Sequence, residues 1–158
     1  MQPLKITDQS YLEQNMSKEL ILRTANFQTI QNVCSDAYFK KKMIAINGEP
    51  GYGKTVALQY FKNTTPNCVI TTVKPSMNAR TFWFEILKTL YYNEGNDEAS
   101  TYRLEHRSLY YILRRVSEAL NRLDNSLLII DEAGKLNERQ ICFLHEIREK
   151  KKKNAGIV

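Results

Sequence analysis

The feature that most constrains the fold is a glycine-rich octapeptide that separates two segments of different periodicity. Residues 48–55 read Gly-Glu-Pro-Gly-Tyr-Gly-Lys-Thr. The apolar run at residues 43–47 precedes them and predicts a short strand, whereas the apolar residues that follow recur at helical spacing. A glycine-rich turn from a strand directly into a helix is typical of α/β proteins, in which strands and helices alternate.

The octapeptide fits the pattern G-x-x-x-x-G-K-[ST], in the strand-before and helix-after context that this pattern requires. Its glycines let successive backbone N–H groups point into one cavity, and the following helix adds the positive end of its dipole. These groups capture phosphates. Lys54 would contact the β- and γ-phosphates of a nucleotide, and the Thr55 hydroxyl is an oxygen ligand suited to Mg²⁺. The structural alternative is an ordinary glycine turn. The predicted nucleotide-binding residues are Gly48, Glu49, Pro50, Gly51, Tyr52, Gly53, Lys54, Thr55 and Val56.

A second apolar run, residues 127–130, ends in Asp131 and Glu132. Ligands bind at the carboxyl ends of strands in open α/β sheets, so this pair of acids is the predicted second half of the site. Asp131 is predicted to hold Mg²⁺ through a water. Glu132 is predicted to orient or deprotonate the water that attacks the γ-phosphate. On its own, an apolar run that ends in two acids is also a common strand-to-loop transition. The predicted catalytic residues are Glu132 and Lys54, and the predicted metal-binding residues are Thr55 and Asp131.

The remaining periodicity predicts an α/β fold of three layers with a mostly parallel sheet and right-handed crossovers. A helical segment over residues 1–39 precedes a core at residues 40–158. The core is expected to be incomplete, because the sequence stops inside the apolar run that predicts a fourth strand. The predicted strands cover residues 43–47, 68–73, 127–131 and 155–158. The predicted helices cover residues 10–22, 26–39, about 79–92 with Ser76 or Asn78 as cap, about 108–123, and about 138–152 with Asn137 as cap.

Three segments together resemble a known group: the loop GEPGYGKT, the strand LLIIDEA and the stretch VKPSMNARTFWFEIL. They resemble the AAA+ ATPases, and within them the branch of transposition regulators similar to phage Mu transposition protein B, from about Arg23 to Val158. The resemblance implies a P-loop NTPase core that hydrolyses ATP with Mg²⁺. It also implies a homo-oligomer when full length, which assembles on DNA and recruits or activates a transposase.

The same resemblance assigns roles to single positions. It places phosphate and magnesium binding at Lys54 and Thr55, magnesium binding at Asp131 and catalysis at Glu132, and adenine contacts near residues 24–27. The family's polar sensor residue, arginine finger and helical lid have no counterpart in this sequence. We therefore expect weak turnover from the isolated chain.

The charge distribution favours a polyanionic partner. The formal net charge is +6, and the first 80 residues hold ten basic against five acidic side chains. Two lysine runs precede the first and fourth predicted strands, which are expected to be parallel neighbours, so both runs would lie at the same edge of the sheet. They are candidate DNA contacts. The alternative is a solvated helix end, where cations are also favoured. The lysines are Lys40, Lys41, Lys42, Lys150, Lys151, Lys152 and Lys153.

Several further features narrow the class of protein. No apolar run approaches the length of a membrane span and no signal peptide is evident, so a cytoplasmic location is expected. Cys34, Cys68 and Cys142 are expected to be buried thiols. Phe82, Trp83, Phe84, Tyr91 and Tyr92 have the spacing of core residues, with base stacking as the alternative.

Two other functions stay open: a nucleotide-gated interaction module without useful catalysis, and a signalling or defence NTPase that does not depend on DNA.

Overall fold

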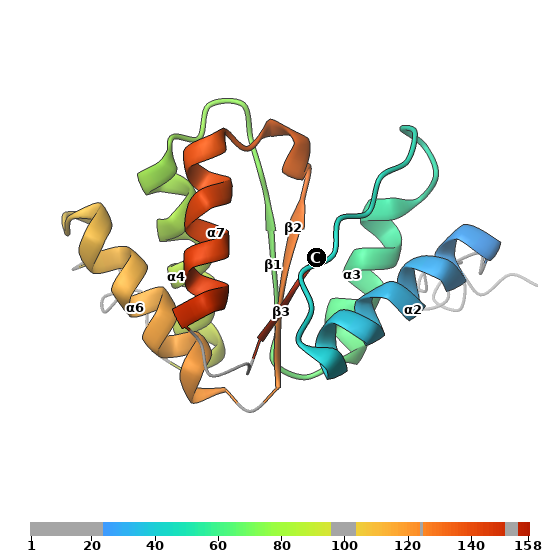
Figure 1. Ribbon diagram of the computed structural model, residues 1–158, viewed down its shortest axis with the longest axis horizontal. Coiled ribbons are helices and arrows are strands. Elements are labelled where there is room, and N and C mark those ends of the chain that lie inside the picture. The colour runs from blue at the N-terminus through green and yellow to red at the C-terminus, as the bar shows by residue number, and fades with distance from the viewer. Residues whose placement is uncertain (1–23, 96–103, 124, 151–154) are drawn as a thin grey trace, which may run out of the picture.

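The computed structural model describes residues 24–95, 104–123, 125–150 and 155–158, and alternates strands with helices (Figure 1). The predicted helix at residues 10–22 and lysines 151–153 lie outside this part of the chain. Within it, no helix is long and apolar enough to cross a membrane. The elements are α2 (Ala25–Lys40), α3 (Lys54–Thr64), β1 (Cys68–Thr72), α4 (Ala79–Asn93), α6 (Leu109–Arg122), β2 (Ser126–Asp131), the 3₁₀ turn η1 (Ala133–Lys135), α7 (Glu138–Lys150) and β3 (Ala155–Ile157).

The three strands form a parallel sheet in the order β1-β2-β3. Helices α4, α6 and α7 cover one face of this sheet, and α2 and α3 cover the other (Figure 1). All six residues of β2 are buried, as expected for a parallel strand with helices on both sides. The predicted three-layer α/β fold with a parallel sheet is therefore confirmed.

The predicted strand at residues 43–47 is wrong beyond its first residue. Met43 forms a single parallel bridge with Ile157, and the Ile44 N–H donates to the Ile157 carbonyl at 2.9 Å. Strand β3 ends at Ile157, so the described residues offer no neighbouring strand against which residues 45–47 could continue the ladder. The bridge does confirm that this segment and β3 are parallel neighbours.

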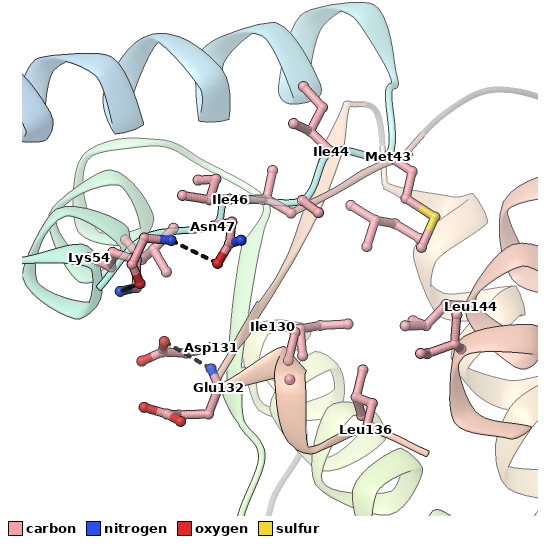
Figure 2. A pocket seen from close by; sticks show the side chains of 18 of the residues that line it. Met43, Ile44, Ile46, Asn47, Lys54, Ile130, Asp131, Glu132, Leu136 and Leu144 are labelled. Carbon is pink, nitrogen blue, oxygen red and sulfur yellow. Dashed lines mark hydrogen bonds between the residues drawn. The ribbon is translucent and has the colours of Figure 1, made fainter. Parts of the chain in front are cut away.

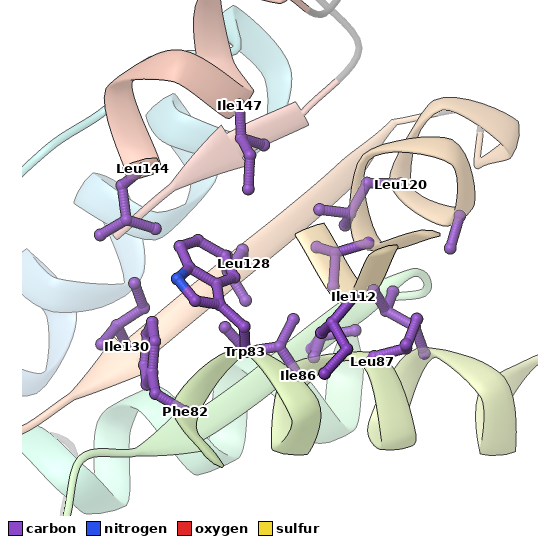
Figure 3. Packing of buried hydrophobic residues seen from close by; sticks show 14 of the residues in the cluster. Phe82, Trp83, Ile86, Leu87, Ile112, Leu120, Leu128, Ile130, Leu144 and Ile147 are labelled. Atoms are coloured by element: carbon purple, nitrogen blue, oxygen red, sulfur yellow. The ribbon is translucent and has the colours of Figure 1, made fainter. Parts of the chain in front are cut away.

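Side chains that alternate along β2 divide the core into two clusters. Leu128 and Ile130 face the larger cluster, in which α4 contributes the fully buried Phe82 and Trp83 and α7 contributes Leu144 (Figure 3). The side chains at 127 and 129 face the smaller cluster, under α2 and α3. The prediction that the aromatic group packs in the core is therefore confirmed for Phe82, Trp83 and Tyr91, which are all buried. Phe84 is half-buried, and Tyr92 is exposed.

Capping side chains fix where the helices begin. Asn78, rather than Ser76, caps α4 by accepting the Thr81 N–H at 2.9 Å. Asn137 and Gln140 cap α7 reciprocally, since each side-chain oxygen accepts the backbone N–H of the other residue at 2.9 Å. Helix α7 therefore begins at Glu138, directly after its cap Asn137.

The cysteines do not share one environment. Cys34 and Cys68 are buried in the smaller cluster, and burial raises the pKa of each thiol to about 12. Cys142 is exposed on α7, so the expectation that all three thiols are buried is wrong for this residue. A cysteine at helical spacing among apolar residues can lie on either face, and here the core positions of α7 are taken by Leu144 and Ile147.

Candidate functional site

The glycine-rich loop connects residues 43–47 to α3 and lies at the surface. Gly51 and Gly53 have φ angles of 86° and 71°, in the left-handed region that glycine adopts without strain. Gly53 is also the N-cap of α3 and gives no side-chain cap hydrogen bond to its first turn. Residues 48–53 are all exposed. The loop therefore places backbone N–H groups at the positive end of a helix, an arrangement suited to binding phosphate.

Lys54 is the first residue of α3, and its side chain folds back over the loop. The ammonium donates to the carbonyl oxygens of Gly48 at 2.5 Å and Glu49 at 2.7 Å. A full positive charge thus lies within the curl of the backbone. Both acceptors are neutral carbonyls, so an anion in the loop would offer the ammonium a stronger hydrogen-bond partner.

Thr55 and Asp131 are 76 residues apart in sequence and in direct contact in the fold. The Thr55 hydroxyl donates to Oδ2 of Asp131 at 2.9 Å. Oδ1 of Asp131 accepts the Glu132 N–H at 2.9 Å, which orients a carboxylate whose residue is only 7% exposed. The end of β2 and the start of α3 therefore meet at one point.

The donor set at this contact fits Mg²⁺. A hydroxyl and a carboxylate are both hard oxygen ligands, and Mg²⁺ binds such ligands at about 2.0–2.1 Å in near-octahedral geometry. Neighbouring ligands of that kind are about 3 Å apart. The 2.9 Å between Thr55 and Asp131 thus matches two oxygens that share one ion or its first water shell.

Glu132 follows Asp131 at a sharp change of chain direction. Its φ of 59° and ψ of 34° are left-handed, which is uncommon for a residue other than glycine. The Glu132 side chain is 51% exposed, and its Oε2 lies 3.0 Å from the ammonium of Lys135. Glu132 adjoins Asp131 in sequence, but its carboxylate pairs with Lys135 and takes no part in the hydrogen bond between Thr55 and Asp131.

A pocket of about 670 Å³ joins these parts, between residues 43–48 on one side and the end of β2 with α7 on the other. Figure 2 shows Lys54, Asp131 and Glu132 at one end of this pocket. The opposite end is apolar and is lined by Met43, Ile130, Leu136 and Leu144. The polar end is where the two predicted halves of the site come together.

Comparison with protein families decides the class of this fold. The family model described as AAA domain matches residues 36–158, which include the loop, β2 and both acids. The chain belongs to the AAA domain family. No curated protein matches the sequence significantly. Membership of the family indicates an AAA-type P-loop ATPase, while the narrower branch of transposition regulators stays a prediction.

Two residues at this AAA site were not singled out by sequence reasoning. Asn47 ends the apolar run before the loop, and its Oδ1 accepts the Gly48 N–H at 2.9 Å. Asparagine before glycine is a turn signal that could have indicated this contact. Lys135, the partner of Glu132, lies three residues after it, the spacing at which side chains meet on a helical turn.

Of the nine predicted nucleotide-binding residues, Gly48, Pro50 and Lys54 line the pocket of about 670 Å³, whereas Glu49, Gly51, Tyr52, Gly53, Thr55 and Val56 do not. Val56 is 49% exposed at the start of α3, and Tyr52 is 51% exposed in the loop.

In the segment predicted to contact adenine, Thr24 caps α2 by accepting the Phe27 N–H at 3.2 Å. The Phe27 ring is buried edge-on against Tyr60, with 5.3 Å between ring centroids. An adenine contact in this segment stays a prediction.

Proposed function

We propose that this AAA domain binds ATP with Mg²⁺ between the glycine-rich loop and the end of β2, and that it hydrolyses the bound ATP. The observation that carries the proposal is the 2.9 Å contact between the Thr55 hydroxyl and the Asp131 carboxylate. These residues come from separate motifs, and no local rule of chain geometry would bring them together. Membership of the AAA family supports the same function.

Each part of the site has a separate task in this proposal. The loop amides and the Lys54 ammonium bind the β- and γ-phosphates, and Thr55 and Asp131 hold Mg²⁺. The bound ion would neutralise charge on the phosphate oxygens. Glu132 accepts a proton from the attacking water, a role that its exposed carboxylate beside Asp131 allows.

Glu132→Gln is expected to separate binding from turnover. The amide keeps the size of the side chain but cannot accept a proton, so ATP affinity should stay within about twofold while turnover falls by about 10²-fold or more. ATP binding measured by calorimetry and phosphate release measured in the same preparation check this result. Glu105→Gln, an exposed change away from the site, is the control. A Glu132→Gln protein that turns over normally would remove Glu132 from its proposed role.

The rival function is a nucleotide-gated interaction module, in which bound ATP orders a surface for partners and hydrolysis has no use. Phosphate release measured against protein concentration, with and without duplex DNA, separates the two. A rate that rises with concentration supports a catalyst that acts when assembled as a homo-oligomer. Binding without any turnover under all these conditions supports the module. A rate of phosphate release that is the same with and without duplex DNA supports a signalling or defence NTPase.

The finer part of the proposal is a role in DNA transposition, with a transposase as partner in the cytoplasm. It rests on the sequence resemblance and on the lysine runs. In the described run, Lys40 and Lys42 lie 2.7 Å and 3.9 Å from carboxylate oxygens of Asp36, and Lys41 donates to the Tyr38 carbonyl at 2.7 Å. These lysines are thus engaged at the end of α2, and exposed pairs of this kind are weak enough for phosphates to displace.

Replacing all seven lysines of the two runs with glutamine tests the DNA proposal. Loss of duplex affinity, with a shallower dependence of log K on log salt, is the expected result, because each phosphate contact releases counterions. An unchanged affinity for duplex DNA and an unchanged slope of log K against log salt would rule out DNA binding through these residues. Nucleotide binding measured in the same variant controls for folding.

A further inference from the structure

The turn after β2 contains an ion pair that the ATPase chemistry proposed above does not use. The Lys135 ammonium lies 3.0 Å from Oε2 of Glu132. The Lys135 N–H also donates to the Glu132 carbonyl at 3.0 Å, so both residues belong to one 3₁₀ turn. Residues three apart eclipse one another in such a turn, which places the two side chains on the same face. Among the described ion pairs, this is the one that includes a predicted catalytic or metal-binding residue.

The backbone fixes the position of this pair. Glu132 is held in a left-handed conformation, and the turn that follows it is closed by a second hydrogen bond, from the Leu136 N–H to the Ala133 carbonyl at 3.0 Å. The Leu136 side chain then packs against the larger core cluster. The turn is therefore anchored at both ends, by β2 and by Leu136, and the fold sets the backbone positions from which Lys135 and Glu132 meet.

We propose that Lys135 is a positioning residue that holds the Glu132 carboxylate in a resting state and so limits turnover. This inference rests on the proposed role of Glu132 as the base. An ammonium 3.0 Å from Oε2 draws the Glu132 carboxylate toward Lys135, and an attacking water has to compete with that ion pair for the carboxylate. Both side chains are about half exposed, 43% for Lys135 and 51% for Glu132, so the pair is weak and opens readily. Lys135 thus restrains the carboxylate without locking it.

Lys135→Met tests the inference, because methionine keeps an unbranched chain and removes the charge. The expected result is a rise in kcat of about two- to fivefold, the size that an exposed ion pair supports, with unchanged ATP affinity. Lys135→Arg restores a cation and should return kcat to the wild-type value. In the Glu132→Gln background, Lys135→Met should have no effect on kcat. The matched control is Arg114→Met, which breaks an exposed pair of 2.8 Å with Glu118 on α6, away from the site.

Each other outcome has a defined meaning. If kcat stays the same or falls in Lys135→Met while ATP still binds, the inference is overturned and the proposed function stands. Weaker ATP binding in Lys135→Met would make Lys135 a phosphate ligand and would also overturn it. A wild-type chain that binds ATP without hydrolysing it, beside a Lys135→Met chain that does hydrolyse it, supports the restraint. If the wild-type chain binds no ATP, the proposed function fails, and the inference that depends on it fails with it.

Discussion

Lys54→Ala is expected to lower the affinity for ATP by about 100-fold, the loss that follows when a charge-assisted contact to a phosphate is removed from a binding site. In the free protein the Lys54 ammonium is held by two backbone carbonyls of the loop, at 2.5 Å and 2.7 Å. In the proposed site it exchanges these carbonyls for phosphate oxygens, and alanine removes the one full positive charge within the loop. Calorimetric titration with ATP and Mg²⁺ measures the change.

Lys62→Ala on the same helix is the control for this experiment. Lys62 is half-buried in the last turn of α3, at the opposite end from the loop, so its removal should leave ATP affinity within about twofold. Far-ultraviolet circular dichroism checks that both variants fold. Full ATP affinity in a folded Lys54→Ala protein would mean that phosphates bind elsewhere.

Gly156→Ala is expected to destabilise the fold by about 2–4 kcal/mol, because overpacking against a rigid neighbour is among the costliest changes in a core. A Cβ at Gly156 would lie 2.1 Å from the Ala37 carbonyl oxygen and 2.9 Å from Cδ1 of Leu127. The first neighbour is backbone, so α2 itself must move away from β3. Ala37 is fully buried in the smaller core cluster, and such a movement would loosen that cluster.

The free energy of unfolding in urea measures this effect. Gly134→Ala is the matched control: a Cβ there would meet no atom within 4 Å, and Gly134 has no positive φ. Its free energy of unfolding should change by less than about 0.5 kcal/mol. Equal stability of the two variants would show that β3 does not pack against the end of α2 as the structure has it.

The parts of this fold that could be predicted from sequence are those with local causes. Asn78 and Asn137 predict helix starts because a capping side chain acts within three residues. The loop and the acidic strand could be found because phosphate binding requires a fixed order of residue types. Their meeting in the fold follows the rule that ligands bind beyond the carboxyl ends of strands in open α/β sheets, although only Met43 of the segment before the loop pairs with the sheet.

The parts that could not be predicted depend on distant neighbours. Residues 45–47 have the composition of a strand, but a ladder needs a partner, and β3 accompanies the segment only near Met43. Cys142 lies among apolar residues in sequence, and only the packing of α7 decides that it faces outward. The pairing of Glu132 with Lys135 depends on a left-handed residue, which no sequence pattern indicates for glutamate.

The most direct test of the central claim is the effect of Mg²⁺ on ATP affinity in the wild-type chain and in Asp131→Asn. If Thr55 and Asp131 share one ion, Mg²⁺ should strengthen ATP binding to the wild-type chain by at least about tenfold, and this gain should disappear in Asp131→Asn while Mg²⁺-free binding is kept. An equal gain from Mg²⁺ in both proteins would contradict the site described above.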